Sequence, residues 1–503
     1  MNTRKRRIVL NVAAIFFMLI LLSQPVTALE LGKSYLYNHR GEAVPAPSGY
    51  VCERVLYGSD LGIGSFQKPQ DLAVDQQGYL YMADTNNNRI VILKPNLSFD
   101  RVIEKVKLPS GEQQSLSAPQ GVSVAGDLLF ICDTGSGRVW GVDKDNIVKR
   151  TLTKPVTELI SKDAEFKPSK VVVNDSGTAY VVASGIYQGL LQYDKNDAFL
   201  GFFGANRVEV TASVLIRNFW KNLFTDEQRA SLVRTVPTEY TNAYIDQKGM
   251  IFTATSTVSS GQVRQLNASG DNILRYPGYN SSLLQMGYDK NNFGDQDVDY
   301  QKGNMIQSRI VDVQVDKDGI LSVLDNQRGR IFQYDKEQNP LCIFGGKGEQ
   351  QGFFKNASAV EKLENRYLVT DMDKNCLTVF KPVPYILTVR AALNAYDKGD
   401  YEEAAALWET TLQQNGGLSV ACRGIGRARL QQGRYQEAMT YLKNGDDRYF
   451  YSLAVQQYRR EFVRKNLWWL FPLAVTLIVG FVWLLKGIKK AILRSAEKEG
   501  RPI

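Results

Sequence analysis

Residues 64–93 read GSFQKPQDLAVDQQGYLYMADTNNNRIVIL. The stretch holds three short strand-like runs, with Gly78 in the turn between the first two and residues 86–88 between the second and third. Short apolar runs separated by turn residues predict an antiparallel meander. The stretch therefore describes one small β-sheet.

The same unit recurs five more times, over residues 119–143, 168–193, 240–266, 309–334 and 356–380. A fourth strand follows the third and fifth copies, whereas the sixth copy has none and a matching strand stands at residues 55–58. That strand can complete the last sheet, and such closure removes the exposed sheet edges. The sequence thus predicts a mainly β fold, a six-bladed propeller of four-stranded units over residues 51–382. The repeat-defining residues include an Asp five positions before an Arg in three copies: Asp84/Arg89, Asp133/Arg138 and Asp325/Arg330.

The first copy resembles an NHL repeat, and the second and fifth copies match the pattern well. This resemblance implies a six-bladed propeller with a central channel and a ligand-binding face. The third and fourth copies match weakly, and both are lengthened by insertions.

The two insertions differ in character. Residues 207–237 have helical spacing, which predicts either a helical pair packed on the propeller or a lid or dock for a partner. Residues 271–307 are polar and rich in Tyr, Asn and Asp, as binding loops often are; a solvated loop is the alternative. The spacing of its aspartates lacks the Gly and Glu of a calcium loop. The candidate ligand- or partner-binding residues are Trp220, Tyr276, Tyr279, Tyr288, Asp295, Asp297 and Asp299.

Residues 384–458 change to a helical pattern. The run from Gly399 to Ala404 recurs from Gly433 to Ala438, 34 residues later. This segment resembles tetratricopeptide repeats, which have that period. The resemblance implies protein–protein contact, and a structural stalk is the alternative.

Both ends of the chain predict contact with a membrane. Residues 1–28 have the basic, apolar and small-residue regions of a signal peptide, with cleavage after Ala28; an uncleaved anchor is the alternative. Residues 467–485 are uncharged and long enough to span a bilayer. We therefore expect a single-pass protein with a lead segment at residues 29–50, an extracellular portion at residues 29–466 and a cytoplasmic tail at residues 486–503.

Composition excludes several functions. The net charge of +9 comes from basic residues at the two ends, so a nucleic-acid-binding surface is not expected. His39 is the only histidine, which excludes the zinc-dependent lyases that share this architecture. The five cysteines are dispersed and predict buried single residues rather than a disulfide framework.

These features predict a binding or scaffold protein without catalytic or cofactor-binding residues. The propeller would recognise a carbohydrate or peptide ligand or a protein partner, and the helical repeats would hold a second protein. The arrangement also resembles bacterial chains that work beside a sugar transporter, which implies an accessory role there. The alternative is a hydrolase resembling gluconolactonases and paraoxonases, which hold calcium in the propeller channel.

Overall fold

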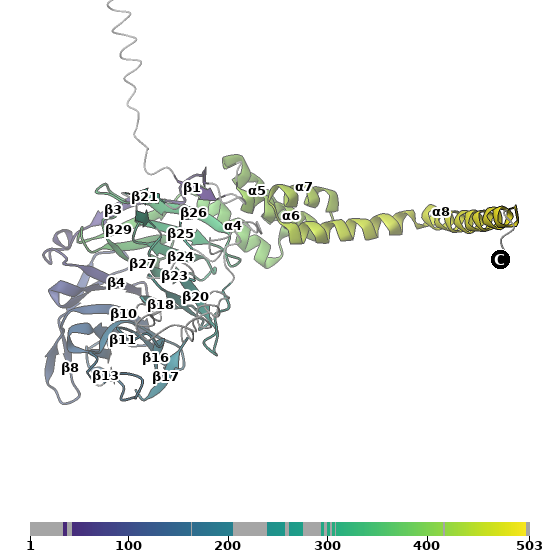
Figure 1. Ribbon diagram of the computed structural model, residues 1–503. Coiled ribbons are helices and arrows are strands. Elements are labelled where there is room, and N and C mark those ends of the chain that lie inside the picture. The colour runs from purple at the N-terminus through teal and green to yellow at the C-terminus, as the bar shows by residue number, and fades with distance from the viewer. Residues whose placement is uncertain are drawn as a thin grey trace, which may run out of the picture. The chain divides into compact units, whose positions relative to one another are not determined.

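The computed structural model describes residues 34–37, 43–161, 163–204, 239–256, 261–274, 293–295, 299–301, 304–306, 308–415 and 418–498. The chain divides into two compact units, Met1–Ile386 and Leu387–Ile503. The predicted signal peptide, the helical insertion and His39 lie outside the described residues. The first unit is formed by β-sheets, and the second unit is helical (Figure 1).

Six antiparallel sheets form the blades of the predicted propeller. The first three sheets comprise β4 (Pro69–Val74), β5 (Leu80–Asp84), β6 (Arg89–Leu93) and β7 (Phe99–Ile103); β10 (Pro119–Ala125), β11 (Leu128–Asp133), β12 (Arg138–Val142) and β13 (Val148–Leu152); and β14 (Lys167–Val173), β15 (Ala179–Ser184), β16 (Leu190–Tyr193) and β17 (Phe199–Phe203). The last three comprise β18 (Asn242–Ile245), β19 (Ile251–Ala254) and β20 (Val263–Leu266); β23 (Ile310–Val315), β24 (Leu321–Asp325), β25 (Arg330–Tyr334) and β26 (Pro340–Gly345); and β27 (Ala357–Leu363), β28 (Arg366–Asp371), β29 (Cys376–Pro382) and β3 (Tyr50–Leu56). Among the described residues, the fourth sheet has three strands.

The inner strands close into a ring. Contacts between neighbouring blades run from β4 through β10, β14, β18, β23 and β27 and back to β4. As the sequence predicts, the N-terminal strand β3 completes the sixth sheet by pairing with β29, with Leu56 opposite Leu377. Tyr50 at the start of β3 is buried against the Phe344 and Tyr367 rings, at centroid distances of 4.7 and 5.0 Å. These contacts fix the closing strand in place.

The first unit also contains shorter elements outside the six blades. They are the two-stranded sheets β1 (Tyr35–Tyr37) with β2 (Ala43–Pro45), β8 (Lys105–Lys107) with β9 (Gln113–Ser115) and β21 (Asp299–Gln301) with β22 (Asn304–Ile306), and the 3-10 helices η1 (Gly58–Leu61), η2 (Thr85–Asn87) and η3 (Thr134–Ser136).

The motif aspartates hold the loops that enter the first and second blades. Fully buried Asp84 accepts the Gln67 N–H at 2.6 Å, and fully buried Asp133 accepts the Ser117 N–H at 2.6 Å. The next residue ties its blade to the following one, since the Thr85 hydroxyl donates to the Pro119 carbonyl at 2.7 Å. A hydrogen bond to a charged group contributes about 1.5–3 kcal/mol. The repeat motif is therefore structural.

The motif arginines behave differently in each copy. Arg89 binds Asp84 at 2.7 Å within its own blade. Arg138 lies over the Trp140 ring at 5.4 Å instead, and Arg330 binds Asp295 at 2.6 Å. Of these three arginines, only Arg89 forms an ion pair with the aspartate five positions before it.

Apolar residues pack between blades rather than into one central core. Ile90 and Ile92 of the first blade, for example, meet Val122, Ile131 and Trp140 of the second, and all five are at most 1% exposed. Four cysteines are buried and Cys52 is partly buried, and all five are free thiols, as predicted.

The second unit contains the helices α4 (Pro384–Lys398), α5 (Tyr401–Gln414), α6 (Ser419–Gln431), α7 (Tyr435–Asn444) and α8 (Arg448–Lys498), of which α4 begins within the first unit. Gly399 and Gly433 lie between helices with φ of 89° and 75°, which favours glycine. Ala404 and Ala438 are fully buried, as expected for small residues between close helices. The 34-residue pattern therefore marks equivalent places in two helical hairpins.

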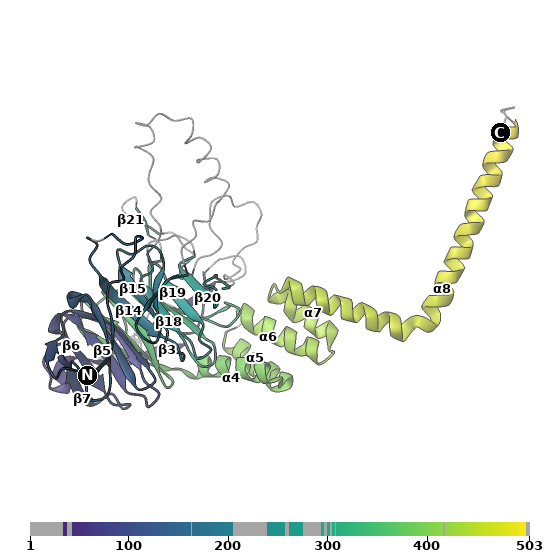
Figure 2. The same ribbon diagram turned by 90° about the horizontal axis from the view of Figure 1, so that it is seen from below.

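Helix α8 is one continuous element of 51 residues that includes the predicted membrane segment at 467–485. It is long and apolar enough to cross a membrane, and its most apolar window buries nothing within the protein. Figure 2 shows a bend in this helix, and Pro472 inside it removes a backbone hydrogen bond. We describe α8 as a candidate membrane span.

Candidate functional site

Five of the six inner strands carry a β-bulge at the same register position, near their N-terminal end. A bulge leaves one residue outside the ladder and re-aims its side chain. The bulged residues are Gln70, Gln120, Ser169, Val311 and Ser358, and Thr241 holds the equivalent place beside β18. All six line one cavity, so every blade contributes to it.

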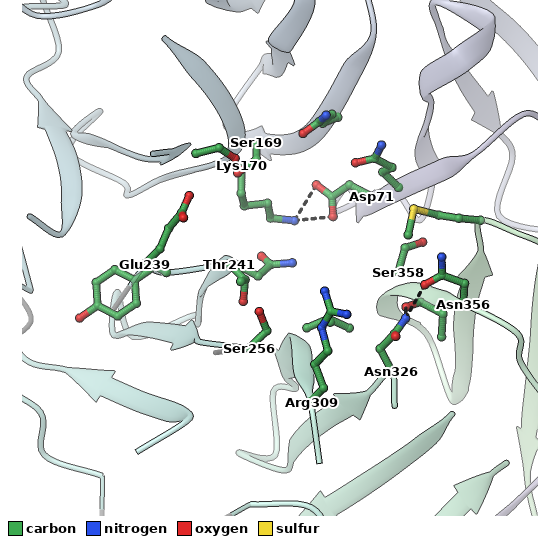
Figure 3. Close-up of a pocket in the computed structure, with 18 residues that line it drawn as sticks. Asp71, Ser169, Lys170, Glu239, Thr241, Ser256, Arg309, Asn326, Asn356 and Ser358 are labelled. Carbon is green, nitrogen blue, oxygen red and sulfur yellow. Dashed lines mark hydrogen bonds and ion pairs between the residues drawn. The ribbon is translucent and has the colours of Figure 1, made fainter. Parts of the chain in front are cut away.

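The cavity has a volume of about 440 Å³ (Figure 3). This volume is in the range of small-molecule sites, roughly 300–1,000 Å³. Most of its lining residues carry a hydroxyl or amide group, and further members are Ser184, Asn242, Ser256, Asn326 and Asn356. Such groups both donate and accept hydrogen bonds. The wall is therefore suited to a small polar ligand.

A buried ion pair crosses one side of the cavity. Lys170 Nζ lies 2.7 Å from both Asp71 carboxylate oxygens, and Asp71 Oδ2 also accepts the Val122 N–H at 2.7 Å. Lys170 belongs to the third blade and Asp71 to the first, and Gly121 lies on the inner strand between them. A Cβ on Gly121 would stand 2.4 Å from the Ser169 carbonyl oxygen. The glycine therefore lets the inner strands β10 and β14 approach closely.

The charges around Lys170 affect its ionisation. Burial alone would lower the Lys170 pKa, but the carboxylates of Asp71 and Asp312 outweigh burial and raise it. The ammonium form is therefore the one present in the cavity wall. Figure 3 shows the pair, which joins the inner strands of the first and third blades.

Two further carboxyl groups lie on the inner strands β23 and β27. Burial raises the pKa of Asp312 to about 7, and burial raises the pKa of Glu361 to about 8. Both Asp312 oxygens accept backbone N–H groups, from Val313 at 2.8 Å and Val360 at 2.7 Å. The inner ring thus holds two carboxyl groups whose pKa values lie near or above neutral pH.

The described carboxylates do not form a calcium shell. Calcium takes six to eight oxygen ligands, whereas Asp71 faces an ammonium and an amide and Asp312 faces two amides. Among the described residues, no group of three or more His, Cys, Asp or Glu side chains is arranged to hold a metal ion.

The cavity rim carries two more charged residues, Glu239 and Arg309. Glu239 accepts the Gly185 N–H at 2.7 Å. The Arg309 side chain points into the cavity in Figure 3. Neither residue was among the sequence-predicted binding residues.

The predicted binding residues of the polar insertion are only partly described. Trp220, Tyr276, Tyr279, Tyr288 and Asp297 lie outside the described residues, and of Asp299 only its backbone place on β21 is described.

Asp295 is buried at a different place from the cavity. It accepts hydrogen bonds from the Tyr35 and Tyr37 hydroxyls, and it forms ion pairs with Arg328 and Arg330. These partners join the lead segment to the fifth blade, so the described contacts of Asp295 are internal.

Sequence reasoning missed the cavity residues, although a signal was present. The signal is the residue that follows Pro69, Pro119, Pro168, Tyr240, Ile310 and Ala357, which is Gln, Gln, Ser, Thr, Val and Ser in the six copies. The NHL pattern treats this position as variable. Reading it across the six copies, instead of along one copy, would have placed five polar side chains in one ring.

Comparisons with known proteins agree with the two repeat types. Residues 66–93 match the NHL repeat family model, and residues 395–450 match the tetratricopeptide repeat model. No curated protein matches the chain.

Solved structures with a similar fold include a virginiamycin B lyase from Staphylococcus aureus, with 7% identity and a TM-score of 0.38 over 64% of this chain and 97% of that one. A PQQ-bound aldose sugar dehydrogenase from Streptomyces coelicolor has 9% identity and a TM-score of 0.38, over 67% of this chain and 99% of that one. A protein of unknown function from Bacteroides thetaiotaomicron has 10% identity and a TM-score of 0.40, over 68% of this chain and 79% of that one. The chain is thus a six-bladed β-propeller with an NHL repeat, followed by a tetratricopeptide-repeat segment and a candidate membrane-spanning helix.

Proposed function

We propose that this chain is a membrane-anchored extracellular scaffold whose propeller binds a small polar ligand in the cavity and whose helical repeats bind a protein partner. The observation that carries the proposal is the cavity itself. Every blade supplies a side chain to it, five of the six through a bulge at the same register position. A site on rigid strands keeps its donors and acceptors in place before the ligand arrives, which lowers the cost of binding.

The rest of the chain supports a scaffold. The tetratricopeptide-repeat match at residues 395–450 favours a protein partner, and α8 supplies a candidate anchor. With the signal peptide predicted at residues 1–28, the propeller would lie outside the cell and the tail at 486–503 inside. A role beside a sugar transport system is consistent with a polar ligand. The proposed function requires no cofactor.

The cavity can be tested by filling it. Gln120 has no side-chain hydrogen bond to another described residue, so Gln120→Trp should occupy the cavity with little loss of stability. Gln77→Trp in the exposed β4–β5 turn is the matched control. The assay is isothermal titration calorimetry of the full chain in nanodiscs against small carbohydrates and short peptides.

We expect at least one probe to bind the wild type and the Gln77→Trp variant, and binding to Gln120→Trp to be at least about tenfold weaker, which is about 1.4 kcal/mol. Equal binding to both variants, or no binding of any probe to the wild type, would contradict the proposed site.

A further inference from the structure

The backbone of Arg309 is held rigidly at the cavity rim. Its N–H donates to Asp325 Oδ1 at 2.9 Å, and its carbonyl accepts the Asn326 N–H at 2.9 Å. Asp325 is fully buried and is the repeat-motif aspartate of the fifth blade. The structural motif therefore fixes the base from which the Arg309 side chain extends into the cavity (Figure 3).

The Arg309 guanidinium has no hydrogen-bond or ion-pair partner among the described residues. Other cations at the starts of inner strands are engaged: Lys68 binds Asp373 at 2.5 Å, and Lys167 binds Glu165 at 2.5 Å. Neither of these lysines lines the cavity. Inside the cavity, Lys170 is paired with Asp71. Arg309 is thus the cavity cation whose donors are unused.

The charged residues of the cavity differ in whether their polar groups are used. The Lys170–Asp71 pair is neutral as a unit, and Glu239 and Arg309 add one charge of each sign. The Glu239 carboxylate accepts the Gly185 N–H, whereas the Arg309 guanidinium has no such partner among the described residues. A guanidinium offers a planar fork of donors that matches a carboxylate or phosphate. The surrounding hydroxyl and amide groups, among them Gln70, Gln120 and Ser256, suit hydroxyl groups on the same ligand.

We propose that the cavity ligand is a small polyhydroxylated anion, a sugar that bears a carboxylate or a phosphate, and that Arg309 binds its anionic group. This inference rests on the proposed function, because it names the ligand class of the same cavity. It makes Arg309 the residue that separates charged from neutral sugars.

The test measures the affinity of glucuronate, glucose 6-phosphate and glucose for the full chain in nanodiscs by isothermal titration calorimetry. The variants are Arg309→Gln, Arg309→Lys and the control Lys68→Gln, which removes a cation that does not line the cavity. Comparison of glucuronate with glucose 6-phosphate shows which anionic group the site takes.

We expect at least one of the two anions to bind about tenfold to a hundredfold more tightly than glucose, the range of a charge-assisted hydrogen bond. Arg309→Gln should remove this preference, Arg309→Lys should keep part of it, and Lys68→Gln should leave it unchanged. Equal affinity for glucose and the anions, or an unchanged preference in Arg309→Gln, would overturn the role of Arg309 and leave the cavity as a neutral-sugar site. Binding of none of the three probes would overturn the anion proposal, and the tryptophan variant of Gln120 then decides whether the cavity binds another polar ligand.

Discussion

The buried carboxyl group of Asp312 should make the propeller less stable at mildly alkaline than at mildly acidic pH. Asp312 is 4% exposed, and burial raises its pKa to about 7. In the unfolded chain the same carboxyl ionises near pH 3.9. As pH rises above about 4, the unfolded state loses this proton while the folded state keeps it, so folding loses stability until the folded carboxyl ionises near pH 7.

The expected size of the effect follows from linkage. Between about pH 5 and about pH 8, this single group should reduce the free energy of unfolding by about 2.5 kcal/mol. For a unit of this length, that corresponds to a fall in melting temperature of about 3 °C. Glu361, with a pKa of about 8, and Asp335, whose pKa burial raises to about 6, add to the decline in this window, so the contribution of Asp312 is the difference between the wild type and a variant that cannot ionise there.

The test is differential scanning calorimetry of the full chain in detergent at the two pH values, on the wild type, Asp312→Asn and the control Asp127→Asn in the exposed β10–β11 turn. Asp312→Asn cannot ionise and should lose about 2.5 kcal/mol of the pH-dependent decline. Its amide also leaves one backbone N–H without an acceptor, but that cost is the same at both pH values. A decline in Asp312→Asn as large as in the wild type would refute the assigned ionisation.

Three further predictions concern packing. Gly121→Val would place a side chain 2.4 Å from the Ser169 carbonyl oxygen and should lower stability by about 1–3 kcal/mol in calorimetry; no change would show that the inner strands can separate. Asp84→Ala removes the acceptor of the Gln67 N–H and the partner of Arg89 and should cost about 3–5 kcal/mol. Arg138 binds no carboxylate among the described residues, so Arg138→Gln should cost less than about 1 kcal/mol. Similar losses in these two variants would contradict the structural role of the motif aspartate. Gly424→Val would bring a Cβ within 2.3 Å of Trp408 Nε1 and should lower the melting temperature of the helical unit by circular dichroism, and an unchanged transition would argue against the close contact of α5 and α6.

The blades and their closure could be predicted from the sequence because each copy repeats the local chemistry that makes it fold. Asn88 adopts φ of 53° in the turn before β6, a conformation that asparagine tolerates, and the turn recurs with Gly137 in the second blade at φ of 65°. The closing strand was visible because the sixth copy lacks a fourth strand. Such features depend on neighbouring residues in the chain.

The cavity and the fate of the motif arginines depend on residues far apart in the chain. Lys170 of the third blade meets Asp71 of the first, and Arg330 binds Asp295 rather than the aspartate of its own copy. The bulges that aim Gln70 and Gln120 into the cavity are a property of strand pairing, which a single repeat does not reveal. A single copy therefore predicts one blade and its repetition predicts the propeller, whereas the site depends on how the six inner strands meet in space.

The pairing of β3 with β29 also has a consequence for biosynthesis. The two strands lie at opposite ends of the propeller sequence, so the segment made first is bonded to the segment made last. Contacts between distant parts of a chain form slowly, because a large loop must close before they contribute stability. During synthesis β3 must wait, with its strand edge unpaired, until the sixth blade has emerged, and such an edge can pair wrongly with another chain. The ring can therefore close only after the whole propeller has been synthesised. Until then, we expect the nascent chain to be the state most exposed to wrong pairing of strand edges.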